Sequence, residues 1–373
     1  MYDKGRAWIE LDIDNLKQNV NEFKKVLPKG CELMPAVKAN AYGHGDVEIA
    51  KALNEMGIYN FCVATVFEGV KLRKSGVEGE ILILGYTHLK NINLVKEYDL
   101  TQTIIDYEYA YLLNECGLNI KVHIKIDTGM HRLGEHFENI TKIIRILSFK
   151  NIVVKGVFSH LCVSDSFNKK DIEFTKLQIN HFNNIVKVLK ENGYLNLKFH
   201  LQGSYGVLNY PDLKYDYVRV GIALYGVLSN KNDKTTLDLR LKPVLSLKAR
   251  VEVVRTLLKD EAIGYGLDFV AKEKSKIAVV SIGYADGISR RLSNKNGFVL
   301  VKGIKVPIIG RICMDQLFID ITNVDSVKRD DEVIFIGKSG DREISVTDMA
   351  VSLDTITNEV LSRLGERLER IYK

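Results

Sequence analysis

One lysine directly follows an apolar run and precedes a loop rich in glycine. Residues 33–37 read Leu-Met-Pro-Ala-Val, Lys38 comes next, and residues 39–45 read Ala-Asn-Ala-Tyr-Gly-His-Gly. An apolar strand would deliver this lysine to a partly dehydrated place, where desolvation disfavours the ammonium form. The free amine can then form a Schiff base with a carbonyl cofactor such as pyridoxal phosphate. The alternative, a lysine that extends from a strand end to solvent, is disfavoured by the polar groups found further along the chain.

Polar groups suited to binding or catalysis follow four other apolar runs. Residues 125–132 read Lys-Ile-Asp-Thr-Gly-Met-His-Arg, residues 159–160 read Ser-His, residues 202–204 read Gln-Gly-Ser, and residues 219–223 read Arg-Val-Gly-Ile-Ala. A single histidine or arginine at a strand end is usually a hydrogen-bonded structural group, and a Gly-Ser pair is usually a turn. Barrel enzymes gather their sites at the C-terminal ends of the strands, so five such groups on one face indicate an active site.

The last two of these segments predict a phosphate site. Loops after the seventh and eighth strands of a barrel commonly bind phosphate through backbone amides, and Ser204 with the amides of Gly221 and Ile222 suits that task. Lys38 would then bind one end of pyridoxal phosphate, and the predicted phosphate site would bind the other. Arg219 would approach the pyridine nitrogen, and an arginine there can only donate, which favours simple proton exchange over reactions through a long-lived carbanion.

The elements that must position these groups alternate regularly over residues 30–225. Short, mostly apolar β-rich runs, typical of parallel strands buried on both faces, are separated by helical patterns such as 46–56, 139–147 and 171–190. Eight such units predict a (β/α)8 TIM barrel over residues 12–235. The predicted strands are 33–38, 60–64, 80–84, 101–105, 122–126, 153–159, 198–202 and 217–220.

The pattern changes after about residue 235. Strand-like runs separated by Gly and Asp turns predict a mainly-β C-terminal domain, with a helix returning over 345–361. The run 6–12 precedes the first predicted helix, 14–26, and has no place among the eight barrel strands. We therefore assign residues 1–11 and 236–373 to the β domain. Its predicted strands are 244–254, 277–282, 298–301, 306–309, 317–321 and 332–336.

The composition is that of a soluble globular protein. The chain has 373 residues, 46% of them hydrophobic and 27% charged, and a formal net charge of +6, which indicates two domains and argues against nucleic acid as a partner. No signal peptide or membrane-spanning run is recognisable, and no metal-binding motif is found, so we expect neither membrane contact from this chain itself nor a metal. Five well-separated cysteines suggest reduced thiols and a cytoplasmic location.

Taken together, these motifs resemble those of the alanine racemase family, fold-type III pyridoxal phosphate enzymes with a barrel followed by a β domain. The similarity covers essentially the whole chain. The resemblance implies a homodimeric racemase that inverts small amino acids by proton transfer at Cα. The matching motifs lie at residues 37–45, 125–134, 219–226, 264–266 (Gly-Tyr-Gly), 283–287 (Gly-Tyr-Ala-Asp-Gly) and 310–316 (Gly-Arg-Ile-Cys-Met-Asp-Gln).

The resemblance implies two catalytic bases. Lys38 would hold the cofactor and act on one face of the substrate, and Tyr265 would act on the other face from across the dimer interface. Racemisation needs this pair because one group removes the α-proton and the other returns a proton to the opposite face. An ordinary amphipathic turn tyrosine is the alternative for Tyr265.

The family also implies roles for the surrounding residues. Lys125 resembles a lysine that is carbamylated in many members, where it holds the arginine that Arg132 matches beside the cofactor's phenolic oxygen; a plain salt-bridging lysine is the alternative. His160 would support the ring and Arg219, and Tyr42 would help to bind phosphate. The substrate entry and carboxylate site would be lined from the partner subunit by Tyr284, Cys313, Met314 and Asp315, although Cys313-Met314 also suits a simple core segment.

One position departs from the family's usual pattern. Alanine racemases show a tyrosine in a context like Asp-Thr-Ile-x-Tyr-Glu, and here residues 354–359 read Asp-Thr-Ile-Thr-Asn-Glu, with Asn358 in its place. The smaller amide opens space and offers a partner to a hydroxyl, and serine is alanine plus one hydroxyl. The chain thus resembles the racemase domain of membrane-bound serine racemases associated with vancomycin resistance. The alternative is that Asn358 is neutral and that the chain is an ordinary alanine racemase for peptidoglycan synthesis.

Two other function classes remain as alternatives. A single-domain pyridoxal phosphate-binding regulator would share the barrel but would lack the β domain and hence Tyr265. A two-domain amino-acid decarboxylase would need room for a long basic substrate, which the segments 264–266 and 313–316 argue against. The sequence therefore favours a racemase that accepts serine and alanine.

Overall fold

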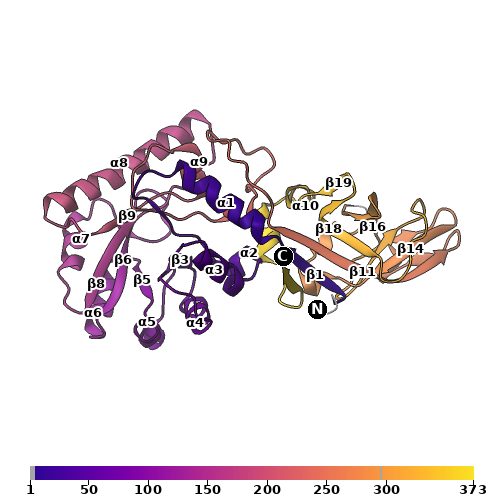
Figure 1. The fold of residues 1–373 in the computed structure, drawn as a ribbon, viewed down its shortest axis with the longest axis horizontal. Coiled ribbons are helices and arrows are strands. Elements are labelled where there is room, and N and C mark those ends of the chain that lie inside the picture. The colour runs from indigo at the N-terminus through magenta and orange to yellow at the C-terminus, as the bar shows by residue number, and fades with distance from the viewer. Residues whose placement is uncertain (1–4, 295) are drawn as a thin grey trace.

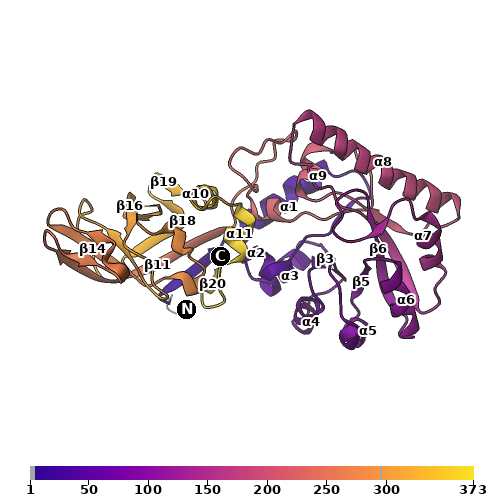
Figure 2. The ribbon, with the colours of Figure 1, turned by 180° about the vertical axis from the view of Figure 1, so that it is seen from behind.

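The protein consists of a barrel and a β domain joined end to end (Figure 1). A computed structural model describes residues 5–294 and 296–373. The first four residues of the predicted β domain lie outside the described residues. Seen from behind, the last helix and the last strand lie at the junction between the two parts (Figure 2). In the described part of the chain, no helix is both long and apolar enough to span a bilayer.

The barrel is built as the sequence predicted. Eight parallel strands of the described chain follow the order β2-β10-β9-β8-β6-β5-β4-β3, and a bridge between Ala36 and Cys62 joins the two ends of this series. The (β/α)8 prediction is confirmed. The strands are β2 (Glu32–Leu33), β3 (Asn60–Val63), β4 (Glu80–Ile83), β5 (Thr101–Ile104), β6 (Ile120–Asp127), β8 (Ile152–Phe158), β9 (Lys198–His200) and β10 (Tyr217–Val218), and the short β7 (Glu135–His136) pairs with β6.

Helices cover the outside of this sheet because their apolar stripes face the strands. In the first of them, α1 (Ile13–Val26), Leu16, Val20 and Phe23 are buried, and Asp12 caps the start by accepting from the amide of Asn15 at 2.8 Å. The remaining barrel helices are α3 (Asp46–Glu55), α4 (Val66–Lys74), α5 (Ile92–Glu97), α6 (Tyr107–Glu115), α7 (Ile140–Leu147), α8 (Lys169–Glu191) and α9 (Ser204–Asn209).

The β domain contains a nine-stranded sheet within the described residues. Its order is β19-β18-β15-β16-β17-β14-β11-β1-β20, and β1 (Ala7–Leu11) pairs antiparallel with β11 (Leu245–Leu257) and parallel with β20 (Glu369–Tyr372). This pairing supports the proposed assignment of residues 1–11 to the β domain. The other strands are β14 (Ser275–Val280), β15 (Phe298–Val301), β16 (Ile304–Ile309), β17 (Leu317–Asp320), β18 (Glu332–Ser339) and β19 (Arg342–Ile344), with a separate pair β12 (Ala262–Ile263) and β13 (Phe269–Val270).

The structure corrects two of the predicted elements. The predicted helix 345–361 is divided into α10 (Val346–Leu353) and α11 (Thr357–Ser362), because Asp354 adopts a left-handed conformation with φ 55°. The predicted strand 33–38 is regular only at Glu32–Leu33, and Lys38 itself begins the short element α2 (Lys38–Tyr42). Residues 34–37 nevertheless remain bonded to both neighbours, since Met34 donates to Val218 and Val37 donates to Cys62.

Candidate active site

The backbone turns sharply in the left-handed sense directly after Lys38. Ala39, Asn40, Ala41 and Tyr42 all have φ between 50° and 55°. Each L-residue in this region costs about 1–2 kcal/mol, and such strain persists only where the surroundings hold it in place. The turn leaves Lys38 at the end of the hydrogen-bonded segment 34–37, on the side of the barrel where its strands end.

The β domain holds this strained turn. Gly43, with φ 83°, closes it, and a Cβ there would lie 2.2 Å from the carbonyl oxygen of Leu361 in α11. Arg370 of β20 donates from Nε to the carbonyl of Gly43 at 3.0 Å, and the Tyr372 hydroxyl donates to the carbonyl of His44 at 3.3 Å. Arg370 and Tyr372 were not predicted from the sequence, since nothing local links residue 43 to residue 370.

Four positively charged side chains of the predicted site act on one another. Burial, and next Arg132, lower the pKa of Lys38. Burial, followed by Arg132 and then Arg219, lowers the pKa of Lys125 to about 8. Within residues 5–294 and 296–373 none of these four groups forms an ion pair with a carboxylate. The arrangement is therefore a cationic site without a direct ion-pair partner in the described part of the chain, in which Asp127 and Glu68 offset only part of the lowering of the pKa of Lys125 and Lys38.

Arg219 is buried, as Lys125 is, and burial lowers its pKa to about 10. Its guanidinium lies 4.9 Å from the centre of the Phe158 ring. Its acceptors are Nδ1 of His200 (2.7 Å), the carbonyl oxygens of Ser159 (2.5 Å) and Leu201 (3.0 Å), and Nδ1 of His160 (3.3 Å). These bonds leave the Nε–H and one Nη1–H without an acceptor among the described residues, so a buried cation retains donors for a ligand. Burial, then Arg219, hold the pKa of His160 well below its usual value.

The predicted phosphate residues lie together at the ends of β9 and β10. The Ser204 hydroxyl accepts from the amide of Gly221 at 3.0 Å and keeps its own proton to donate. A Cβ at Gly221 would lie 2.7 Å from the Tyr42 hydroxyl, so the absence of a side chain there lets the phenol approach the backbone. Ile222 follows and begins η2 (Ile222–Tyr225), where the amide of Ala223 also donates to the Ser204 hydroxyl at 3.4 Å. Together with the free donors of Arg219, this donor set fits pyridoxal phosphate, an anion at one end and a ring nitrogen acceptor at the other.

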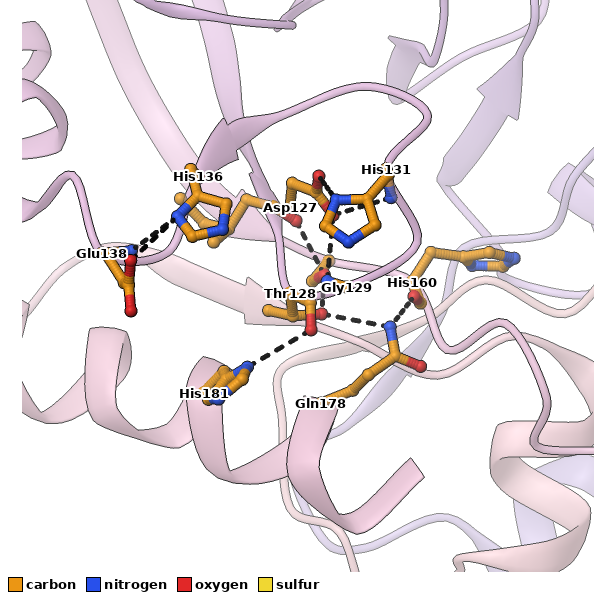
Figure 3. Close-up of polar contacts among 11 residues, drawn as sticks. Asp127, Thr128, Gly129, His131, His136, Glu138, His160, Gln178 and His181 are labelled. Atoms are coloured by element: carbon orange, nitrogen blue, oxygen red, sulfur yellow. Dashed lines mark hydrogen bonds and ion pairs between the residues drawn. The ribbon is translucent and has the colours of Figure 1, made fainter. Parts of the chain in front are cut away.

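A fully buried glutamine links the two loops that carry Arg132 and His160 (Figure 3). Gln178 of α8 donates from Nε2 to Thr128 Oγ1 at 3.3 Å and to the His160 carbonyl at 3.1 Å, and its Oε1 accepts from the amide of Cys162 at 3.1 Å. The sequence analysis did not identify Gln178, because a glutamine within a helical pattern carries no local signal of this role.

Asp127 shapes the segment that leads to Arg132 (Figure 3). Its carboxylate accepts from the amides of Gly129 and His131, each at 3.0 Å, and contacts His131 Nδ1 at 3.0 Å. His131 takes the left-handed conformation with φ 54° that this turn requires. Arg132 itself is exposed in the single chain.

The site residues predicted in the β domain at positions 265, 284 and 313–315 form no hydrogen bond or ion pair with the barrel in the described part of the chain. Their hydrogen bonds and ion pairs in the described part of the chain stay within that domain: the amide of Tyr284 donates to the Cys313 carbonyl at 3.0 Å, and Asp315 pairs with Arg367 at 2.7 Å. Exposed fractions are 69% for Tyr265, which begins η3 (Tyr265–Leu267), 43% for Tyr284, which begins η4 (Tyr284–Asp286), and 52% for Met314.

Asn358 lies on α11, which packs against α2. Thr357 pins the start of α11 by donating its amide to the Ser229 carbonyl at 2.9 Å and its hydroxyl to the Leu228 carbonyl at 2.7 Å. The Oδ1 atom of Asn358 is buried and has no hydrogen-bond partner within the described residues. A buried amide oxygen without a donor is costly, and a ligand hydroxyl would satisfy it.

Comparison with known proteins covers nearly the whole chain. The family models for the alanine racemase N-terminal domain and C-terminal domain match residues 11–229 and 244–372. An amino-acid racemase of Enterococcus faecalis is 44% identical over 100% of this chain and 52% of its own length. A serine/alanine racemase of Enterococcus gallinarum is 40% identical over 99% of this chain and 52% of its own length. The chain thus spans about half the length of these relatives.

Solved structures agree. The alanine racemase of Clostridium difficile 630 matches with a TM-score of 0.93 and 34% identity, covering 100% of this chain and 96% of that one. An alanine racemase from Bartonella henselae, described with covalently bound pyridoxal phosphate, matches with a TM-score of 0.85 and 30% identity over 99% of this chain and 100% of that one. The chain belongs to the alanine racemase family.

Proposed function

We propose that this chain is a pyridoxal phosphate-dependent amino-acid racemase that interconverts the L- and D-forms of serine and alanine. The cationic site formed by Lys38, Lys125, Arg132 and Arg219 carries the proposal, because these groups have no direct ion-pair partner among the described residues and suit a phosphorylated cofactor and a substrate carboxylate. Family membership and the names of the relatives support the same reaction class.

The barrel residues would hold the cofactor at both ends. Lys38 would bind its aldehyde carbon, while Tyr42, Ser204 and the amides of Gly221 and Ile222 would hold the phosphate. The free donors of Arg219 would meet the ring nitrogen, with His160 beside them. Pyridoxal phosphate, when bound, withdraws electrons from Cα of the amino acid and so makes the α-proton removable.

Two bases then move the proton. Burial favours the neutral amine of Lys38, which can take a proton from one face of Cα or return it there. Tyr265 would serve the opposite face from a second copy of the chain, because it is exposed here and bonds to no barrel residue in the described part of the structure. We therefore propose a homodimer with shared sites, in which Tyr284, Cys313, Met314 and Asp315 of the second copy border the substrate.

We further propose that Lys125 is carbamylated. A carbamate forms from the free amine, which the lowered pKa of Lys125 makes available. It would place an anion beside Arg132 and Arg219. The alternative of a salt-bridging lysine finds no support, since Lys125 has no ion-pair partner within the described residues.

Asn358 is the proposed determinant for serine. Its unpartnered Oδ1 would accept a hydrogen bond from the substrate hydroxyl. A site that merely accommodates an extra hydroxyl discriminates by only about a hundredfold, so alanine remains a substrate. We also propose a cytoplasmic location, which the five free cysteines support.

Wash-in of solvent deuterium at Cα tests the proposed reaction. The protein loaded with pyridoxal phosphate is incubated in D2O with L-serine and with L-alanine, and label and enantiomer ratio are followed by NMR and chiral chromatography. We expect label in both enantiomers of both substrates. Absence of label from both amino acids would refute the racemase, and carbon dioxide release from lysine or ornithine would establish a decarboxylase instead.

A further inference from the structure

Four side chains form a line through the barrel interior, starting from Arg219. Arg219 contacts His200 of β9, His200 contacts His123 of β6, and His123 contacts Glu80 of β4. The distances are 2.7 Å from Arg219 Nη1 to His200 Nδ1, 2.8 Å from His200 Nε2 to His123 Nδ1, and 3.0 Å from His123 Nε2 to Glu80 Oε1. Both histidines are fully buried, and the Glu80 side chain is 24% exposed.

A glycine makes this line possible. His123 pairs with Gly156 of β8, which lies between β6 and β9 in the sheet. A Cβ at Gly156 would lie 2.8 Å from Cε1 of the His123 ring. The missing side chain therefore leaves the space through which His123 reaches His200. Phe158 stacks on His200 with ring centres 4.8 Å apart and limits the tilt of its ring.

The chemistry of the two ends determines where each proton lies. An arginine can only donate, so Nδ1 of His200 must accept and its proton must be on Nε2. That N–H donates to Nδ1 of His123, whose own proton is therefore also on Nε2 and faces Glu80. Burial, then Arg219, hold the pKa of His200 well below its usual value, which agrees with a neutral ring.

The last contact differs from the first two. His123 Nε2 and Glu80 Oε1 lie 3.0 Å apart, yet both atoms are buried without a well-directed hydrogen bond in the described residues. The contact is therefore chiefly electrostatic. It still disfavours the other tautomer of His123, because that tautomer would turn a nitrogen lone pair toward the carboxylate.

We propose that His123 and Glu80 are positioning residues that act through His200 to orient the Arg219 guanidinium and to offset its buried charge. Among the described residues no carboxylate forms an ion pair with Arg219, and Glu80 is the anion that lies against the last histidine of its hydrogen-bonded line. Hydrogen bonds in such a series polarise one another, so an anion at one end strengthens Nδ1 of His200 as the acceptor for Arg219. The proposal rests on the proposed function in one respect, namely that Arg219 meets the cofactor ring.

Nitrogen NMR of histidine side chains tests this arrangement without reference to activity. The chain is labelled with 15N-histidine, its signals are assigned by replacing His123 and His200 in turn, and spectra are recorded with pyridoxal phosphate bound and removed. We expect both rings to be neutral with the proton on Nε2. A mixture of tautomers at His123, or a proton on Nδ1 of either ring, would overturn the proposal. This outcome needs only the spectrum of the unsubstituted protein.

Substitutions at the far end extend the test. In Glu80→Leu we expect the protons to stay on Nε2, because the donors of Arg219 already set both tautomers, but we expect the 15N signals of His123 and His200 to shift because the anion is lost. Glu80→Gln should shift these signals less, because the amide oxygen can still face Nε2 of His123. Glu32→Leu is the matched control: Glu32 stands at the start of β2 as Glu80 does at the start of β4, and it bonds to Asn60 at 2.8 Å outside the line. A Glu80→Leu spectrum identical to that of Glu32→Leu would refute the role of Glu80.

Kinetics then separate positioning from chemistry. Turnover in Glu80→Leu should fall about tenfold, as expected for weakening a hydrogen bond to a charged group, with the substrate KM unchanged and Glu32→Leu unaffected. Equal turnover in Glu80→Leu and Glu32→Leu would contradict the positioning role. If the unsubstituted protein shows the expected tautomers but exchanges no α-proton, the proposed function is refuted and the arrangement from Arg219 to Glu80 stands. If the protein is a racemase but its histidines show mixed tautomers, only the proposed arrangement is refuted.

Discussion

The barrel half and the β-domain half of the candidate site are built differently. Lys125 and Arg219 are buried and their pKa values are lowered. Tyr265 and Tyr284, by contrast, stand at 69% and 43% exposure on short turns of the β domain. The barrel groups are enclosed by their own chain, whereas the tyrosines of the β domain are exposed on its surface.

The difference indicates which half depends on a second copy. Arg219 is buried and held by hydrogen bonds from its own barrel, so a single chain can prepare this part of the site. An exposed tyrosine with no barrel contact acquires fixed geometry only when another surface covers it. The same β domain also reaches back to its own barrel, since Arg370 and Tyr372 hold the turn after Lys38.

Subunit mixing tests directly whether the two bases of one site come from different chains. Lys38→Ala and Tyr265→Ala should each lower turnover by about 10⁴-fold, because each removes one of two bases. Mixing the two variants, with unfolding and refolding to exchange subunits, should restore about a quarter of the parent activity, since half of the dimers are mixed and each mixed dimer has one intact site. Activity is measured as racemisation of L-alanine. No recovery after demonstrated exchange would show that both bases come from one chain.

Substitution of Asn358 addresses a β-domain residue that serves its own barrel. Asn358→Tyr should lower the ratio of kcat/KM for L-serine to that for L-alanine by about a hundredfold, because the hydroxyl loses both its space and its partner. Ser362→Tyr, at an exposed position of the same helix, is the matched control and should leave the ratio unchanged. If the unsubstituted protein and Asn358→Tyr have the same ratio of kcat/KM for the two substrates, Asn358 does not determine specificity and the chain is an ordinary alanine racemase.

The contact between the two domains at the strained turn sets a stability prediction. Gly43→Ala should lower the free energy of unfolding by about 3 kcal/mol. The new Cβ would clash with the Leu361 carbonyl oxygen, and alanine is also unfavourable at the positive φ of this position. Gly193→Ala is the matched control, with φ 87° and nothing within 4 Å of the new Cβ, and should cost only about 1 kcal/mol. Urea unfolding at equilibrium measures both. Similar losses in the two variants would show that the packing of Leu361 against the turn contributes little.

The lowered pKa of Lys125 predicts that the stability of the folded chain depends on pH. This pKa is lowered from the unfolded value to about 8 in the folded chain, so the unfolded chain binds more protons between about pH 8 and pH 10. Stability should therefore rise with pH across that window by on the order of 2 kcal/mol. The measurement is urea unfolding of cofactor-free protein in buffers purged of carbon dioxide. Lys125→Met should lose this rise, and a rise of equal size in the variant would assign it to other groups.

The strands and most helices were predictable from the sequence because their signals are local. Apolar runs and helical stripes repeat every few residues, and the eight barrel strands were found within a few residues of their observed bounds. The helix over 345–361 was predicted as continuous, because nothing in its pattern marks Asp354 as left-handed. The turn after Lys38 was missed for the same reason: its conformation is imposed from outside rather than by its own residues.

The candidate site divides in the same way. The motifs identified Lys38, Arg219 and Ser204, whose residue types and strand-end positions carry the signal. Gln178 and the line from Arg219 to Glu80 were missed because a glutamine in a helix, or a histidine in a strand, says nothing about its partner 50 or 77 residues away. The role of Tyr265 was supplied by resemblance, and its geometry across two chains stays a prediction.

Local sequence signals were sufficient to predict the alternation of strands and helices, the change to a β domain, and the residue types at the strand ends. Those features depend on contacts between near neighbours and on the periodicity of burial. The packing of distant segments was needed to establish which groups the histidines contact, how Gln178 joins two loops, and that Arg370 holds a carbonyl 327 residues away. These depend on where distant segments meet, and that is set by the packing of the whole chain.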